Sequence, residues 1–120
     1  WLAELGDVYQ DLELTAEALA CYLQARDLDP GRRRYTDKAG AAILSLRGQK
    51  EAISFWEEES AKDPEWSRPH FIRAKLLLAD GRTAEAKREI GQAVTLKPGY
   101  RDYAKWQVRI ENILYREESP

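Results

Sequence analysis

Only a few residues in this sequence could carry out chemistry, and they are isolated from one another. His70 is the only histidine, so no second residue can share a proton-relay role with it, and we interpret it as a surface or packing residue. Cys21 is the only cysteine and lacks the features that activate a thiol, which favours a packed side chain over a nucleophile. Carboxylates alone would have to bind a metal, and none has the spacing of a calcium loop. The sequence therefore predicts no enzyme, no metal and no cofactor.

The composition is that of a water-compatible chain with enough apolar residues for a core. It has 120 residues, 43% hydrophobic and 33% charged, with a formal net charge of −2. No run of about 18 apolar residues is present, so we expect no membrane insertion by this chain. The balance of 19 basic against 21 acidic residues argues against nucleic acid as the partner. A single cysteine cannot form an intrachain disulfide, and we expect a cytoplasmic location.

A 34-residue period organises the chain. One tetrapeptide returns unchanged after two periods, because both Thr15–Ala18 and Thr83–Ala86 read Thr-Ala-Glu-Ala. Three sets of equivalent positions keep a small residue or a proline: Gly6, Gly40 and Ala74; Ala18, Ala52 and Ala86; Pro30, Pro64 and Pro98. We therefore divide the chain into three repeats, residues 1–32, 33–66 and 67–100, followed by a further segment.

Each repeat is predicted to form two helices separated by a short break. Apolar residues recur at helical spacing in six runs, at about residues 2–12, 18–28, 39–46, 52–61, 71–79 and 84–96. Thr15 and Thr83 stand where an N-cap is needed. Gly48 and Gly81 stand where a left-handed C-cap would end the first helix of a repeat. The recurring prolines close the second helices, because proline cannot continue the hydrogen-bond ladder.

The recurring small residues predict that the two helices of a repeat approach closely. Glycine within a helix costs about 1 kcal/mol relative to alanine, so its presence at Gly6 and Gly40 needs a reason. We expect a partner helix to pack directly on these positions. The alanines Ala18, Ala52 and Ala86 are the facing small residues, and larger residues fill the space around them: Tyr9, Tyr22, Trp56, Leu77 and Ile90.

This pattern resembles the tetratricopeptide repeat family. The first repeat holds its signature residues at Leu5, Gly6, Tyr9, Ala18, Tyr22, Ala25 and Pro30, and the third holds Ala74, Leu77, Gly81, Ala86, Ile90, Ala93 and Pro98. The second repeat departs most, with Ala39, Ile43 and Glu59 where leucine, tyrosine and alanine are usual. The resemblance covers residues 1 to about 100. It implies an all-α, right-handed superhelical solenoid of antiparallel helix hairpins, about seven helices in all.

Residues 101–118 form one more predicted helix. Its apolar stripe consists of Tyr103, Trp106, Ile110, Ile113 and Leu114, and its opposite face carries Arg101, Lys105, Arg109 and Glu111. A repeat array needs a helix to cover the apolar side of its last repeat. We interpret this helix as a C-terminal cap, and the first helix of a truncated fourth repeat is the alternative.

The resemblance also implies a concave groove, lined by the first helix of each repeat, in which a peptide or partner helix lies. The groove is expected to have an acidic end, an apolar centre and a basic end, so an amphipathic partner of opposite polarity would be complementary. The partner-binding candidates are Asp7, Asp11, Asp37, Leu44, Arg68, Phe71 and Lys75, with Trp66 as either an inter-repeat packing residue or an exposed anchor. Binding by the convex face or by the ends of the array is the alternative.

Members of the family that bind chaperones hold a C-terminal carboxylate with lysine and asparagine side chains. The matching positions in this chain hold Ala3, Asp7, Lys38, Arg68 and Ile72. The lysine and the asparagine of the first repeat are missing. A peptide that ends in Glu-Glu-Val-Asp is therefore not an expected ligand.

These features predict a protein–protein interaction scaffold or adaptor without enzymatic activity. Because the chain begins at Trp1 and contains no methionine, we expect it to be a segment of a longer protein. One alternative is a regulatory repeat domain of a larger membrane-associated secretion or glycosyltransferase assembly, such as exopolysaccharide or pilus export. Another is self-association, in which Trp1 and Leu2 at the N-terminal end pack on a second copy.

The small net charge conceals a gradient along the repeats. Residues 1–32 carry 2 basic and 7 acidic residues, whereas residues 67–100 carry 7 basic and 3 acidic residues. Such polarity would orient a partner along the groove or favour head-to-tail contacts, and both effects weaken as salt rises. The acidic run Glu57–Glu59 is interpreted as a solvated helix face, with an interaction site as the alternative.

Overall fold

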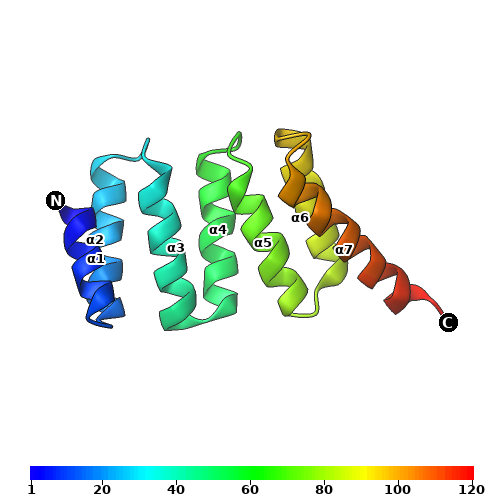
Figure 1. Cartoon of the computed structure of the whole chain (residues 1–120), viewed down its shortest axis with the longest axis horizontal. Coiled ribbons are helices and arrows are strands. Elements are labelled where there is room, and N and C mark those ends of the chain that lie inside the picture. The colour runs from blue at the N-terminus through cyan, green and yellow to red at the C-terminus, as the bar shows by residue number, and fades with distance from the viewer. The chain divides into compact units, whose positions relative to one another are not determined.

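The computed structural model describes all 120 residues and contains seven α-helices and no strand (Figure 1). The helices are α1 (Leu2–Asp11), α2 (Thr15–Leu28), α3 (Arg33–Arg47), α4 (Gln49–Lys62), α5 (Arg68–Ala79), α6 (Thr83–Leu96) and α7 (Arg101–Glu118). The predicted all-α fold of helix hairpins is confirmed. The largest difference is at α3, which begins six residues before the predicted run because its first turn is polar and carries no apolar period.

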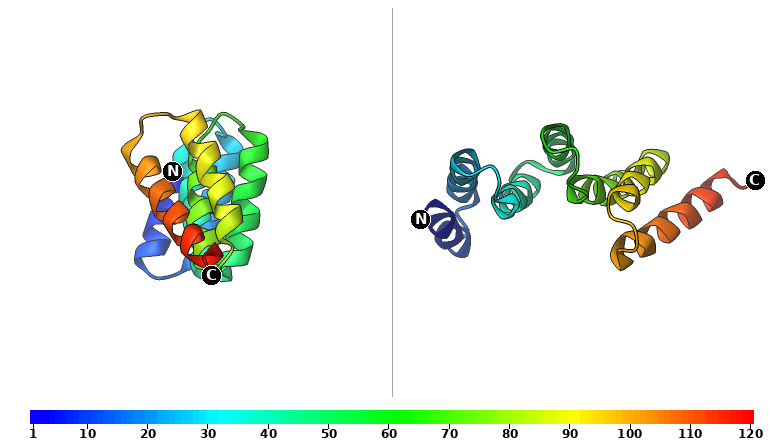
Figure 2. Two further views of the ribbon diagram at one scale, coloured as in Figure 1. Left: turned by 90° about the vertical axis from the view of Figure 1, so that its right-hand side faces the viewer. Right: turned by 90° about the horizontal axis from the view of Figure 1, so that it is seen from above.

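The chain divides into two compact units, Trp1–Ala52 and Ile53–Pro120, so the boundary falls within α4 and inside the predicted second repeat. In the first unit α2 packs against both α1 and α3, and in the second unit α6 packs against both α5 and α7 (Figure 2). Within each unit, the second helix of a hairpin therefore holds two successive first helices in place.

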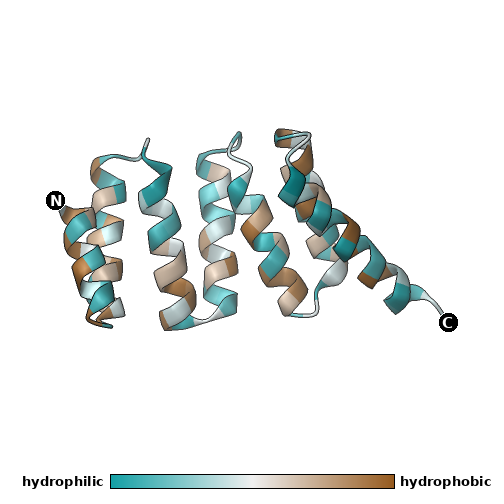
Figure 3. Ribbon diagram, in the orientation of Figure 1, coloured by the Kyte–Doolittle hydropathy of each residue, from teal (hydrophilic) through white to brown (hydrophobic).

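The core is built from one side of each helix. Apolar and polar residues alternate along the helices (Figure 3), as expected for helices with one face toward a neighbour. The alanines predicted at the helix contacts, Ala18, Ala52 and Ala86, are completely buried. No helix combines the length and the apolar character that crossing a membrane requires.

Gly6 shows why a small residue recurs within the first helix of a repeat. A Cβ atom at this position would lie 2.6 Å from Cε1 and 2.9 Å from Cδ1 of Tyr22. Both distances are shorter than any van der Waals contact, so the ring of Tyr22 occupies the space that a side chain would need. In the third repeat the equivalent residues are Ala74 and Ile90, both completely buried. The third repeat thus has alanine in place of glycine, and its facing side chain is the smaller isoleucine in place of tyrosine.

The turns after α1 and α5 have the same hydrogen-bond pattern. After α5, the amide of Arg82 donates to the carbonyl of Leu77 at 2.9 Å, and Gly81 adopts a left-handed φ of 78°. After α1, the amide of Leu14 donates to the carbonyl of Tyr9 at 2.8 Å, and the left-handed residue is Glu13, with φ 61°. These six-to-one bonds define a Schellman ending, which satisfies free carbonyls of the last helical turn.

Two predicted helix ends differ from the structure. Thr15 and Thr83 are the first residues of α2 and α6 rather than N-caps, and the N-cap residues Leu14 and Arg82 make no side-chain capping bond. The Schellman turns place the residue before each threonine at the N-cap position, so each threonine is the first residue of its helix. At Gly48 a positive φ of 93° is present as predicted, but ψ is −178°. The residue therefore lies outside the left-handed helical region, in a conformation open almost only to glycine.

The acidic run of α4 is not solvated throughout. Glu57 and Glu58 are exposed, whereas Glu59 is buried, with its Oε1 3.6 Å from Nζ of Lys62. Three successive helical residues span about 200° around the helix axis, so one of them has to turn toward the core. Glu59 also stands at the position that holds the buried alanines Ala25 and Ala93 in the other two repeats.

Candidate protein-binding interface

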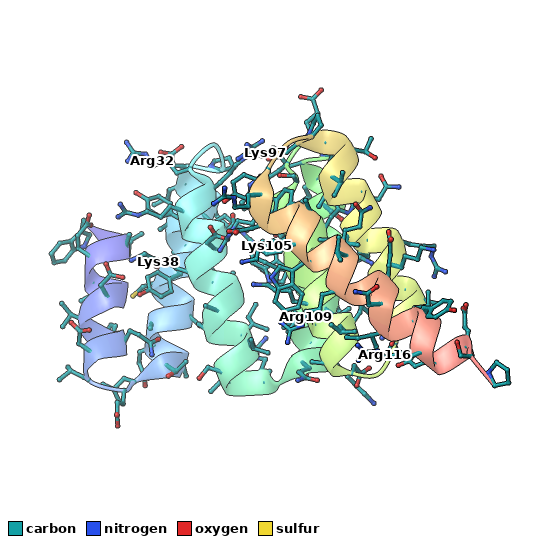
Figure 4. The ribbon with its side chains drawn as sticks, turned by 45° about the vertical axis from the view of Figure 1, so that its right-hand side comes forward. Arg32, Lys38, Lys97, Lys105, Arg109 and Arg116 are labelled. Carbon is teal, nitrogen blue, oxygen red and sulfur yellow. The ribbon has the colours of Figure 1, made fainter.

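The acidic candidate Asp7 is engaged by its own chain. Its Oδ1 accepts a hydrogen bond of 2.6 Å from the hydroxyl of Tyr22 on α2 and another of 2.6 Å from Nζ of Lys38 on α3. Figure 4 shows Lys38 in this part of the chain. The bond from Lys38 and then that from Tyr22 lower the pKa of the Asp7 carboxyl. Burial, followed by the bond to Asp7, raises the pKa of the Tyr22 hydroxyl.

A shallow hollow lies beside this trio of side chains. It has a volume of about 200 Å³ and is lined by Gln10, Tyr22, Lys38, Ala41, Ala42 and Ser45. These residues come from α1, α2 and α3, so the hollow belongs to the first unit. Its walls are small or polar, and its one cation is already paired with Asp7. The face of α1 and α3 therefore presents little uncompensated charge at this point.

The other candidates of the first unit remain available to a ligand to different degrees. Asp11 is exposed, Asp37 is half-buried and Leu44 is 39% exposed. At the N-terminal end, Trp1 is 87% exposed, which leaves the predicted self-association surface open. The charge of Asp7 is balanced within the chain, which leaves Asp11 as the exposed acid at the acidic end of the expected groove.

Trp66 is not an exposed anchor. Its exposure is only 9%, and its ring packs against that of Trp56 on α4 at a centroid distance of 5.8 Å in an edge-on arrangement. Trp66 lies in the loop between α4 and α5, and this loop places it against Trp56. Of the two roles predicted for Trp66, the packing role is therefore the one that the structure has.

Phe71, expected in the apolar centre of the groove, is buried by α7. Its ring lies 4.8 Å from that of Tyr103 and 6.4 Å from that of Trp106, measured between centroids. Nearby, the hydroxyl groups of Ser67 and Tyr103 are hydrogen-bonded at 2.9 Å. The sequence prediction expected this helix to cover the apolar side of the last repeat, but it placed Phe71 in the open groove and did not connect the two.

Of the two basic candidates of the second unit, Lys75 lies over aromatic rings. Nζ of Lys75 is 4.4 Å from the centroid of Phe71 and 5.9 Å from that of Trp106. Burial, and then the charge of Arg68, lower the pKa of Lys75, while Asp102 opposes them. Arg68 itself is exposed. The predicted basic end is therefore present on α5, and an aromatic side chain of α7 adjoins it.

The sequence prediction missed a second group of residues on α7. Lys105, Trp106 and Arg109 line a hollow of about 160 Å³, and the guanidinium carbon of Arg109 lies 5.0 Å from the centroid of Trp106. Figure 4 shows Lys105 and Arg109 close together along α7. The 34-residue period could have revealed them, because Lys105 and Arg109 follow Phe71 and Lys75 by one period.

The two isolated reactive residues are both part of the packing. Nδ1 of His70 lies 2.6 Å from Oε2 of Glu89, which also contacts Nη1 of Arg73 at 3.1 Å, and this cluster joins α5 to α6. Cys21 is a free, buried thiol. Both observations confirm the packing interpretation. No group of three or more potential metal-ligating side chains is present.

Comparison with known proteins identifies the repeat. Residues 2–32 match the family model described as tetratricopeptide repeat. A comparison with curated protein sequences finds no match.

Solved structures extend the likeness to the whole chain. The first tetratricopeptide domain of human RPAP3 has a TM-score of 0.76 at 22% identity, over 98% of this chain and 92% of that one. The first such domain of Spaghetti (RPAP3), bound to the HSP90 peptide SRMEEVD, has a TM-score of 0.75 at 22% identity, over 95% and 90%. The Yersinia enterocolitica secretion chaperone SycD, in complex with a peptide of the translocator YopD, has a TM-score of 0.70 at 21% identity, over 96% and 88%. The chain therefore contains a tetratricopeptide repeat at residues 2–32 and has the tetratricopeptide-repeat fold over its length.

Proposed function

We propose that this chain is a protein-interaction module that binds a segment of a partner protein on the faces of its first helices, α1, α3, α5 and α7. The observation that carries the proposal is the fold: two proteins of the same fold, matched over 95% and 96% of this chain, are solved with peptides bound. One hollow is lined by α1, α2 and α3 and the other by α7, and they give a bound segment places to insert side chains.

The side chains that we propose for partner binding are those that this chain leaves accessible. In the first unit they are Asp11, Asp37 and Leu44, and in the second unit they are Arg68 and Lys75. Trp66 and Phe71 are buried and would support the interface from beneath rather than contact the partner.

The test is capture of partner proteins by the immobilised chain, with variants as controls. A protein retained by the chain should be lost or weakened when Asp11 and Asp37 are both changed to lysine, because the partner's cations then face like charge. The control is Glu57→Lys with Glu58→Lys, two exposed acids on the second helix α4. Retention that responds equally to both pairs would contradict a binding site on the first helices.

The sequence prediction of a membrane-associated secretion or glycosyltransferase assembly stays a prediction, as do the cytoplasmic location and the self-association through Trp1 and Leu2. A concentration series in light scattering tests self-association directly. A mass that stays monomeric at every concentration would rule it out.

A further inference from the structure

The face of α5 and α7 repeats the register of the face of α1 and α3, but with different chemistry. Lys75 follows Asp7 by two periods of 34 residues, and Trp106 follows Lys38 by the same distance. In the first unit this pair of positions is an ion pair with Nζ and Oδ1 2.6 Å apart. In the second unit the same positions hold a cation over an aromatic ring, at 5.9 Å. Neither of these two positions in the second unit holds a carboxylate, and Asp102 acts on Lys75 through its charge without forming an ion pair.

The cations around Trp106 have no ion-pair partner within the chain. Lys105 and Arg109 line the hollow beside its ring, and Lys75 reaches over the ring from α5. None of these three cations forms an ion pair with a carboxylate of the chain, although other cations of the second unit, such as Arg73 and Arg82, do so. The charge of Asp102 acts on Lys75 without forming an ion pair. Like charges that are not paired repel one another, and a ligand that supplies carboxylates would relieve the repulsion.

Trp106 provides an apolar surface beside these three cations. The indole is half-buried, and Phe71 packs against it at 6.4 Å between centroids. Nζ of Lys75 lies 5.9 Å from the centroid of its ring, and the guanidinium carbon of Arg109 lies 5.0 Å from it. Tryptophan and arginine are the side chains most enriched among residues that dominate binding energy. A ligand that fits here would place an apolar or aromatic side chain against the indole and acidic groups at the surrounding cations.

We propose that the α5–α7 face binds an acidic segment of a partner protein, whose carboxylates pair with Lys75, Lys105 and Arg109 and whose apolar side chain lies on Trp106. The inference rests on the proposed function and adds the chemistry of the partner. The site differs from the carboxylate-binding positions that the family resemblance implies, because Trp106, Lys105 and Arg109 are not among them. It also differs from the α1–α3 face, where Asp7 would repel the same ligand.

The test uses two terminally blocked peptides and the full chain. One peptide consists of glutamate and phenylalanine residues, and in the other glutamine replaces every glutamate. We expect the chain to bind the first peptide, and the Lys105→Glu, Arg109→Glu double variant to bind it roughly tenfold more weakly. Raising the salt from low to about 0.15 M should weaken binding, since the pairs are partly exposed.

Matched variants separate the site from general attraction. Arg109→Glu alone should also weaken binding. Arg116→Glu makes the same charge change as Arg109→Glu farther along α7 (Figure 4), so it should leave binding nearly unchanged. Trp106→Phe should retain much of the affinity that Trp106→Ala loses, because phenylalanine keeps an aromatic face. Circular dichroism verifies that each variant keeps its helices. Lys75→Gln, which keeps an aliphatic stem, tests the α5 side without placing a negative charge near Arg68.

Three outcomes would overturn the proposal. They are equal binding of the glutamine peptide, equal losses for Arg116→Glu and Arg109→Glu, or equal affinity for a single-stranded RNA of the same charge. The proposed function fails separately. If partner capture depends on Asp11 and Asp37 but not on Lys105 and Arg109, the chain still binds proteins and only the acidic-segment inference is wrong.

Discussion

The faces of α1–α3 and α5–α7 place side chains at equivalent positions, yet one balances its charges and the other does not. At the first, Asp7 accepts hydrogen bonds from Tyr22 and Lys38. At the second, Lys75 and Arg109 flank Trp106 without a carboxylate partner. The repeat supplies a fixed geometry, and the residues at a few first-helix positions decide whether that geometry is used for internal stability or remains open to a ligand.

The largest expected difference between the two hairpins concerns their closest helix contact. Gly6→Ala should destabilise the chain by about 1–3 kcal/mol, since the new Cβ would lie 2.6 Å from the Tyr22 ring, which the hydroxyl bond to Asp7 holds in place. Adding Tyr22→Ile creates the alanine–isoleucine pair that the third repeat has at Ala74 and Ile90. Urea unfolding of both single variants and the double variant measures the coupling, and strictly additive losses would contradict the contact.

The second difference is at the Schellman turns, where Glu13 and Gly81 are equivalent. Gly81→Glu should cost about 1–2 kcal/mol, because a left-handed φ is unfavourable for a residue with Cβ. No atom lies within 4 Å of a Cβ at Gly81, so the effect comes from the backbone alone. Glu13→Gly should stabilise the first turn by up to about 1 kcal/mol. Thermal unfolding of the two variants should shift in opposite directions, and shifts of the same sign would contradict the shared geometry.

A smaller difference is expected when the charged residues are neutralised. Asp7→Asn should reduce the free energy of unfolding by about 0.5–1 kcal/mol, since the pair with Lys38 is partly exposed. Lys75→Gln at the equivalent position should change stability less, because Lys75 forms no ion pair and Asp102 acts on it only through its charge. Chemical unfolding at neutral pH measures both. If Lys75→Gln is the more destabilising, the ring contacts of Lys75 contribute more than the ion pair.

The smallest effect is the pH dependence of stability, with a different window for each face. The pKa of Asp7 is held below its ordinary value of 3.8, so the stability that its ionised form contributes is present above that value and is lost as pH falls through the lowered pKa. The pKa of Lys75 is held below 10.5, so the unfolded chain binds the extra proton and stability rises with pH between the lowered pKa and 10.5. The free energy of unfolding, measured across acidic and alkaline pH, should lose its acidic dependence in Asp7→Asn and its alkaline dependence in Lys75→Gln.

The errors of the sequence prediction had two sources, the turn that precedes a helix and a partner that lies far along the chain. Thr15 and Thr83 fit the N-cap preference, but the Schellman turn one step earlier set the start of each helix. Phe71 stands at a groove position by its spacing, and it is α7, more than 30 residues later, that covers it. Local preferences carry no information about a side chain that arrives from another element.

The amino-acid sequence by itself determined the seven helices, their pairing as hairpins and the small residues at Gly6, Ala18 and Ala86. Helical periodicity, the 34-residue repeat and steric limits on glycine and proline act over short distances, so one chain suffices to read them.

Only the tertiary structure decided which charges are balanced. Asp7 and Lys38 come together because α2 holds α1 and α3 side by side, whereas α6 holds α5 and α7 so that Lys75 meets Trp106. The charge counts of the repeats are the same in any conformation. Electrostatic energy depends on distances of a few ångströms, and packing sets those distances.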